Sequence, residues 1–118
     1  MYFIDDADMS KKSIAPGVDI AVAGGEKAQM SFVTLNPGGT VPMHNHPHEQ
    51  LGVVLEGEFV LVIGDEKRTI KPGDKYVIPG GVNHGVPEVI VKSVALDIFS
   101  PPREEYRAAG SGVGSEGA

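Results

Sequence analysis

Short runs of strand-forming residues, each closed by a turn signal, occupy most of this 118-residue chain. The runs lie at residues 18–23, 28–35, 51–55, 59–63, 68–71, 75–78 and 89–99. Glycine, proline, asparagine or acidic residues follow nearly all of them, which is typical of strands joined by turns. An apolar repeat of 3.6 residues, the mark of an amphipathic helix, is hard to find. The pattern therefore predicts an all-β sandwich or barrel of about nine strands.

The two ends of the chain differ from this pattern. Residues 1–8 (MYFIDDAD) carry more apolar side chains than a free terminus needs, and we expect a further strand there that covers a sheet edge or a partner subunit. Residues 102–109 (PREEYRAA) follow a proline suited to a first helical turn, so a short helical turn is expected. Residues 110–118 are small and polar, which predicts a flexible tail after a single domain at 1–109.

The composition narrows the classes of partner. The formal net charge is -6, which argues against nucleic acid and against an anionic membrane surface, since both attract basic proteins. The chain has no cysteine, no signal-like start and no apolar run that approaches the roughly 18 residues of a membrane span. We therefore expect a cytoplasmic protein. A small anionic partner stays compatible with this charge, because a local cation reverses the local field.

Three of the four histidines lie within residues 41–50 (VPMHNHPHEQ). If this stretch is a strand, His44 and His46 share a face, and Gln50 has the same parity on the strand that follows. His84 would have to arrive from a different hairpin. Imidazoles held this close can chelate a divalent transition metal, whereas an incidental polar surface is the alternative. His48 is interpreted as a residue of a loop or pocket mouth.

Glycine and proline spacings around these histidines resemble the two motifs of the cupin family. The residues that carry the resemblance are Gly38, His44, His46, Gln50 and Gly57 in the first motif, and Gly73, Pro79, Gly81 and His84 in the second. The resemblance implies a jelly-roll β-barrel that binds a metal inside, with ligands from both motifs. Gly57 and Gly73 are expected at hairpin turns that need a positive φ.

Two positions depart from the usual cupin pattern. The family's glutamate is replaced by Gln50, and Glu49 has the parity that places it away from the histidines. Glu88 stands where the second motif usually has asparagine, at a position that is not a ligand. With His44, His46, Gln50 and His84 as ligands, a bound dication keeps its full +2 charge. Such a centre favours the binding of anions and non-redox chemistry. Iron oxygenases, by contrast, usually have a carboxylate among their metal ligands. Zinc, nickel, cobalt, manganese and iron all remain open.

The segments HPHEQ, LEGEF and DIFSPPREEY resemble the KdgF type of cupin. That resemblance implies conversion of a 4,5-unsaturated uronate into its linear 4-deoxy-5-keto form. It also implies Asp97 as the catalytic acid/base and Phe99 and Arg103 as substrate-binding residues. Asp97 and Arg103 each have a simpler interpretation. Asp97 could be a lone polar residue of a strand, and Arg103 could form a surface ion pair with Glu104 or Glu105.

Three functions stay open from the sequence. The first is the uronate conversion, on a small anionic sugar or similar organic acid. The second is an iron-dependent dioxygenase on the same scaffold, and the third is a small-molecule-binding cupin without catalysis. A homodimer is expected, because exposed sheet edges are usually covered by pairing.

Overall fold

The computed structural model describes residues 2–108, which form eight antiparallel strands and two short helical segments. The strands are β1 (Ser10–Ala15), β2 (Val18–Gly24), β3 (Gln29–Leu35), β4 (Val41–His44), β5 (Glu49–Ile63), β6 (Glu66–Ile70), β7 (Lys75–Ile78) and β8 (His84–Ser100). A 3₁₀ turn, η1 (Asp6–Asp8), precedes them, and α1 (Glu104–Ala108) follows. The all-β architecture and the helical turn near the C-terminus are confirmed.

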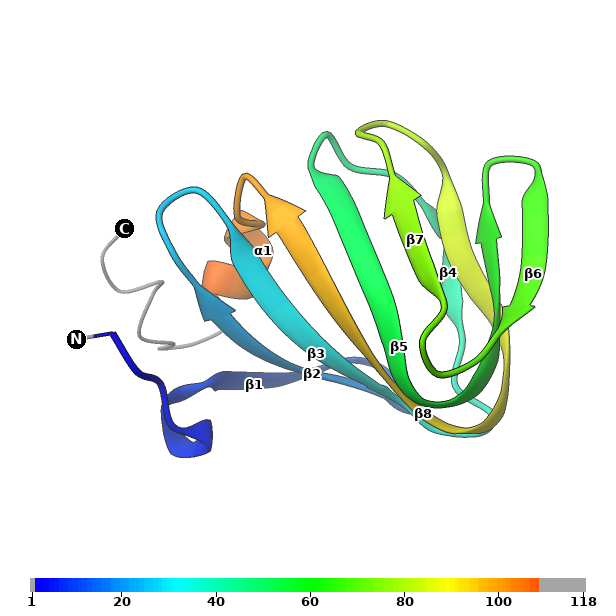
Figure 1. The fold of residues 1–118 in the computed structure, drawn as a ribbon, viewed down its shortest axis with the longest axis horizontal. Helices are drawn as coiled ribbons and strands as arrows, with labels where there is room; N and C mark the ends of the chain where they lie inside the picture. The colour runs from blue at the N-terminus through cyan, green and yellow to red at the C-terminus, as the bar shows by residue number, and fades with distance from the viewer. Residues whose placement is uncertain (1, 109–118) are drawn as a thin grey trace.

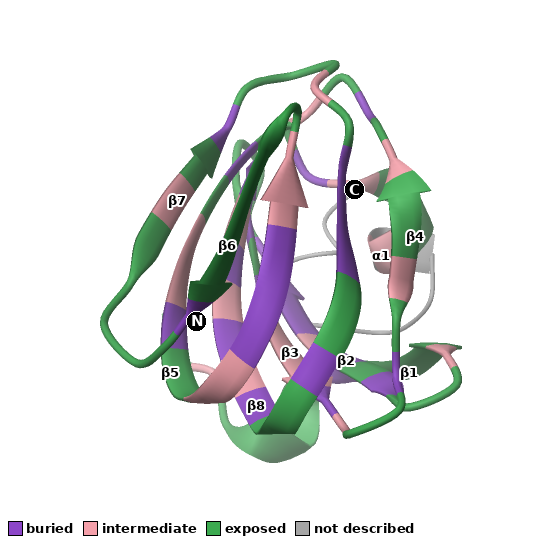
Figure 2. Ribbon diagram, turned by 90° about the vertical axis from the view of Figure 1, so that its right-hand side faces the viewer, coloured by how far each residue is buried: buried purple, intermediate pink, exposed green. Residues whose placement is uncertain are grey.

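Two long strands, β5 and β8, build both layers of the fold (Figure 1). They pair along their length, and their halves belong to different layers. In one layer the order is β1-β2-β3-β8-β5-β7. In the other layer β4 and β6 flank the remaining halves of β8 and β5. Buried positions alternate with more exposed ones along the first part of β2 and the second half of β8 (Figure 2), because one face of the layer meets the interior.

Gly57 allows β5 to turn the corner between the layers. It lies inside β5 with a φ of 86°, so our expectation of a hairpin turn at this residue is wrong. A Cβ here would overlap the Ser93 hydroxyl and the Lys92 carbonyl of β8. The fully buried Ser93 hydroxyl accepts a hydrogen bond from the Glu58 N–H at 2.9 Å and donates one to the Val91 carbonyl at 2.7 Å. The corner therefore needs both the positive φ and the absence of a side chain.

Apolar residues from both layers form the core. Its buried members are Val18, Leu35, Val54, Phe59, Leu61, Ile70, Val86, Val89 and Ala95. Neither β1 nor β4 was among the runs identified from their strand-forming residues, although a strand that carries His44 was considered for the histidine cluster. Four of the six residues of β1 are exposed, and no residue of β4 is fully buried, so neither shows a clear apolar alternation.

The N-terminal segment differs from its prediction. Residues 2–5 are not a strand, η1 follows them, and Tyr2 and Phe3 are almost fully exposed. The acidic residues Asp5, Asp6 and Asp8 disfavour a strand there, which is the physical reason for the error. The flexible tail expected at 110–118 lies outside the described residues. Within residues 2–108, no helix has the length and apolar character needed to cross a membrane.

Candidate metal centre

Three histidines from two separate chain segments meet inside the fold. His44 ends β4, His46 follows two residues later, and His84 begins β8. The register of β4 and β8 pairs His44 directly with His84. One nitrogen of each ring lies within 4.8 Å of those of the other two, and the cluster is able to hold a metal ion. The strand expected to carry both His44 and His46 ends at His44, so His46 reaches the cluster from a loop.

Hydrogen bonds fix which nitrogen of each imidazole faces the cluster centre. In all three rings Nδ1 lies close to a backbone carbonyl oxygen two residues away. The three acceptors are the carbonyl oxygens of Pro42 (2.8 Å, to His44), His48 (3.1 Å, to His46) and Val82 (2.9 Å, to His84). A carbonyl only accepts, so each Nδ1 carries the proton and each Nε2 keeps a lone pair. The His84 Nε2 is buried without a partner, and outward N–H anchoring of this kind is typical of metal-binding histidines.

Gln50, near the start of β5, brings an oxygen to the same place. Its Oε1 lies 3.2 Å from the His46 Nε2. The Gln50 side chain also hydrogen-bonds to the Asp97 carboxylate, which only an amide N–H can do, so Oε1 is the atom that faces the histidines. Two lone pairs at this separation repel unless a cation lies between them. Glu49 is exposed on the opposite side, as its parity predicted.

Burial keeps two of these imidazoles uncharged. It lowers the pKa of His46, with a further contribution from the positive charge of Arg103. Burial also lowers the pKa of His84, to about 4. Metal ligands must be unprotonated, so both rings are ready to bind a cation near neutral pH.

Asp97 lies beside the cluster on β8 and is only 7 % exposed. Its Oδ1 accepts a hydrogen bond of 2.6 Å from the Tyr76 hydroxyl of β7. Burial raises the pKa of Asp97 to about 6, although the hydrogen bonds from Tyr76 and Gln50 oppose this rise. A carboxyl group with this pKa can both accept and release a proton near neutral pH. Tyr76 was not singled out from the sequence. The available signal was that Tyr76 lies two residues before the buried Ile78 in β7 and so shares its inward face.

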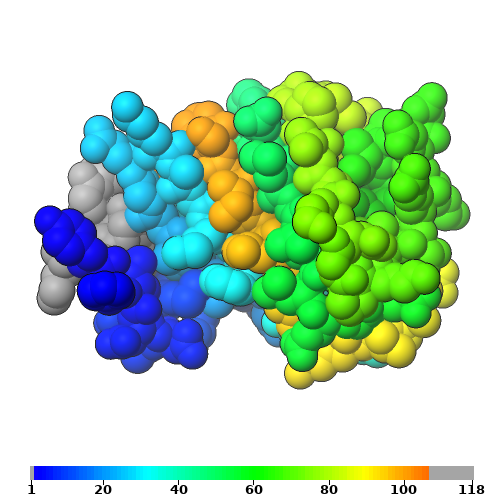
Figure 3. Space-filling model, in the orientation of Figure 1, coloured from blue at the N-terminus to red at the C-terminus, as the bar shows by residue number. Residues whose placement is uncertain are grey.

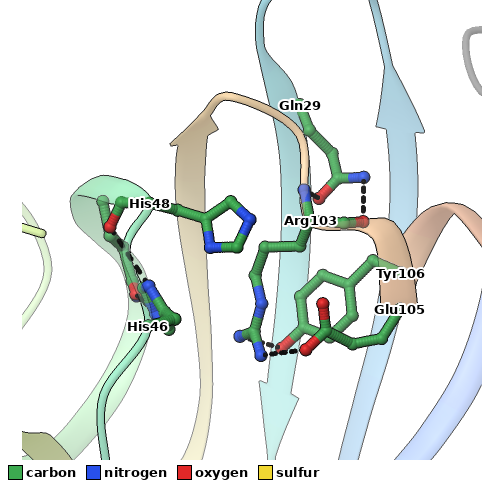
Figure 4. Close-up of polar contacts among 7 residues, drawn as sticks. Gln29, His46, His48, Arg103, Glu105 and Tyr106 are labelled. Atoms are coloured by element: carbon green, nitrogen blue, oxygen red, sulfur yellow. Dashed lines mark hydrogen bonds and ion pairs between the residues drawn. The ribbon is translucent and has the colours of Figure 1, made fainter. Parts of the chain in front are cut away.

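Arg103, beyond the end of β8, lies with its side chain 12 % exposed and its guanidinium engaged from two sides. Nη1 donates to the Tyr106 hydroxyl, and Nη2 forms an ion pair with Glu105, each at 3.1 Å (Figure 4). The guanidinium carbon also lies 4.4 Å from the centre of the Tyr106 ring. The sequence left open that Arg103 only forms an ion pair with Glu104 or Glu105, and the pair with Glu105 is present. Both residues of this pair also line the cavity described below.

Gln29 and Phe99 support this arginine. The buried Gln29 side chain clamps the Arg103 backbone, donating to its carbonyl at 3.3 Å and accepting from its N–H at 3.2 Å (Figure 4). The two residues are 74 positions apart, so no local sequence signal could have identified Gln29. The Phe99 ring contacts both sides of the site, with its centre 5.6 Å from that of His46 and 5.4 Å from the Arg103 guanidinium.

One cavity of about 370 Å³ joins these groups. Its polar lining includes His44, Gln50, His84, Asp97 and Arg103, and Phe99 contributes to the apolar wall. The volume lies in the range of small-molecule sites, and such sites combine mostly apolar walls with a few convergent polar groups. Every residue singled out from the sequence as a ligand or substrate contact therefore lies at this cavity or, like His46, against its lining.

Known proteins match both the sequence and the structure of this chain. Residues 31–92 match the cupin domain family. The chain is 33% identical over 107 residues to the pectin degradation protein KdgF of Dickeya dadantii (strain 3937), covering 89% of this chain and 96% of that protein. The solved structure of KdgF from Halomonas sp. superposes with a TM-score of 0.80 at 28% identity, covering 89% of this chain and 97% of that one. Oxalate oxidase 1 of Hordeum vulgare is 36% identical over 64 residues, but these span only 47% of this chain and 32% of that protein.

Proposed function

The chain belongs to the cupin family, and from that premise we propose that it is a metal-dependent enzyme that converts a 4,5-unsaturated uronate into its linear 5-keto form. One observation carries the proposal: three imidazole nitrogens and an amide oxygen converge beside a buried carboxyl group, in a cavity that also contains an arginine. The similarity to a pectin degradation protein along nearly the whole of both chains supports the choice of substrate.

The donor set fits a divalent transition metal. We assign His44, His46, His84 and Gln50 as the residues that would hold it, since they offer three nitrogens and one oxygen without any formal charge. The buried, unpartnered Nε2 of His84 supports this assignment. When bound, such an ion polarises an oxygen atom of the substrate and stabilises negative charge that develops there.

The substrate carboxylate is assigned to Arg103. A guanidinium presents paired N–H donors that match a carboxylate, and this one is held in place by Tyr106 and by the Gln29 clamp on its backbone. In this arrangement the substrate carboxylate would take over the position that Glu105 occupies on Nη2. Phe99 forms the wall between Arg103 and the histidines, which keeps the two polar ends of the cavity apart.

Asp97 is assigned the proton transfers. Ring opening removes a proton from the anomeric hydroxyl and breaks the bond between that carbon and the ring oxygen. The bond's electron pair leaves with the ring oxygen as an enolate, which becomes the ketone when C4 is protonated, so one proton is taken and one is returned, and no oxidant is needed. A single carboxyl group with a pKa of about 6 has the proton affinity for both steps.

A spectrophotometric assay tests the proposal. The conjugated double bond of the unsaturated uronate absorbs in the ultraviolet, and its loss follows the reaction. We expect the protein to accelerate this loss over buffer, and a chelator or Asp97→Asn to abolish the acceleration. A rate equal to that of buffer would refute the proposed function.

Two other outcomes point to the other functions considered. Oxygen uptake that requires added Fe(II) would indicate a dioxygenase, which the partial similarity to an oxalate oxidase keeps in view. Tight uronate binding without turnover would indicate a small-molecule-binding cupin. Elemental analysis of protein purified without a nickel column identifies the metal.

A further inference from the structure

Tyr76, Gly52 and Asp97 lie side by side on three neighbouring strands. Gly52 of β5 pairs with Tyr76 of β7 on one side and with Asp97 of β8 on the other. Residues in register on adjacent strands point to the same face, and all three therefore face the interior. Tyr76 and Asp97 both line the cavity.

Gly52 makes room for the Tyr76 ring. A Cβ at this position would overlap the ring carbons and the hydroxyl oxygen of Tyr76. Gly52 does not have a positive φ, so its backbone conformation is open to any residue and only the space requires glycine. The ring thus lies across the Gly52 backbone and reaches over β5 to the next strand.

The Tyr76 hydroxyl has a single proton and donates it to Asp97 Oδ1 at 2.6 Å. Gln50 donates to the same carboxylate from β5. Two donors from two strands hold this carboxyl group in one orientation at the cavity wall. A buried hydrogen bond to a charged acceptor is stronger than a neutral one, so it restricts the side-chain rotation of Asp97 effectively.

We propose that Tyr76 is a positioning residue, which reaches across Gly52 to hold the carboxylate of Asp97 in the orientation needed for proton transfer. This inference rests on the proposed function, because that function makes Asp97 the catalytic acid/base. Tyr76 acts through Asp97 and does not itself exchange a proton with the substrate. A misdirected catalytic group lowers the rate of the chemical step more than it lowers substrate affinity.

Tyr76→Phe tests the proposal because it removes one oxygen atom and keeps the ring. We expect kcat for the unsaturated uronate to fall by about 10–100-fold, the loss typical of one charge-assisted hydrogen bond, with KM changed less than twofold. Metal content should stay the same. Tyr2→Phe is the matched control, since Tyr2 is 96 % exposed and loses the same atom. A kcat within twofold of wild type, or a rise in KM alone, would overturn the proposal.

Proton NMR tests the hydrogen bond without any turnover. We expect a resonance well downfield of the amide protons in wild type and in Tyr2→Phe, and its loss in both Tyr76→Phe and Asp97→Asn. If this resonance persists in Tyr76→Phe, the positioning role is wrong. If wild type shows the resonance but no activity, the proposed function fails while the contact itself stands. Gly52→Ala, which displaces the ring, should reproduce the loss of the resonance.

Discussion

Gln50→Glu tests whether the uncharged ligand set is what attracts an anionic substrate. The amide N–H of Gln50 donates to the Asp97 carboxylate, and its Oε1 lies 3.2 Å from the His46 Nε2. The substitution replaces the donor with an acceptor and adds one negative charge. A bound dication and its four ligands would then carry +1 in place of +2.

The size of the effect follows from one charge pair. At a separation of about 6 Å and an effective dielectric constant of about 20, the new carboxylate and a bound uronate carboxylate repel by about 3 kcal/mol. We therefore expect uronate binding to weaken by about a hundredfold. Turnover should fall further, because Asp97 loses the N–H donor of Gln50.

Isothermal titration calorimetry with a saturated uronate measures this affinity without turnover, since the ligand has the carboxylate but no double bond at C4–C5. Elemental analysis should show that the metal is retained, because a carboxylate is also a good ligand. Glu49→Gln is the matched control, as it changes the charge by one unit on the exposed side of the same strand and should alter affinity less than twofold. Unchanged or tighter uronate binding by Gln50→Glu would refute the charge argument.

Four further predictions concern the metal, the fold and assembly. His84→Ala should lose the metal, so added metal should raise the melting temperature of wild type but not that of the variant. Burial lowers the pKa of His84 to about 4 and also lowers that of His46. Metal binding at pH 6 should therefore release fewer protons, measured by calorimetry in two buffers, than the roughly two that three imidazoles of ordinary pKa would release. Gly57→Ala should cost about 3 kcal/mol or more of unfolding free energy in denaturant melts, against about 1 kcal/mol for Gly73→Ala, because both have positive φ but only Gly57 lacks space. The homodimer expected from the sequence should use the outer face of β3, β8, β5 and β7 (Figure 3). Leu51 and Val77 pair on this face and are 40% and 56% exposed. Replacing both by lysine should therefore halve the mass measured by light scattering.

The spacing of residues along the chain was enough to predict the fold class and the candidate ligands. Strand parity is a local property, so it placed Gln50 inward and Glu49 outward without reference to any other strand. The two motif spacings singled out His44, His46 and His84, and the structure brings all three together. Local patterns also predicted the helical turn now seen as α1.

Other features depended on residues far apart in the sequence, and only the tertiary structure revealed them. The expected hairpin at Gly57 is a corner inside β5, because the contact that requires glycine comes from Ser93 on another strand. Tyr76 faces Asp97 only because β7 and β8 flank β5 in register at Gly52.

The same limit applies to the electrostatics of the site. The resemblance singled out Asp97, but the sequence did not indicate its proton affinity. Burial raises the pKa of Asp97 to about 6, and burial is set by the whole fold. The sequence by itself thus determined which side chains are available for chemistry and which way each strand presents them. The packing of strands that are distant in the sequence decided which partners each of these side chains has, how far it is hydrated and hence whether it is charged. The physical reason is that solvation and hydrogen bonding depend on neighbours in space.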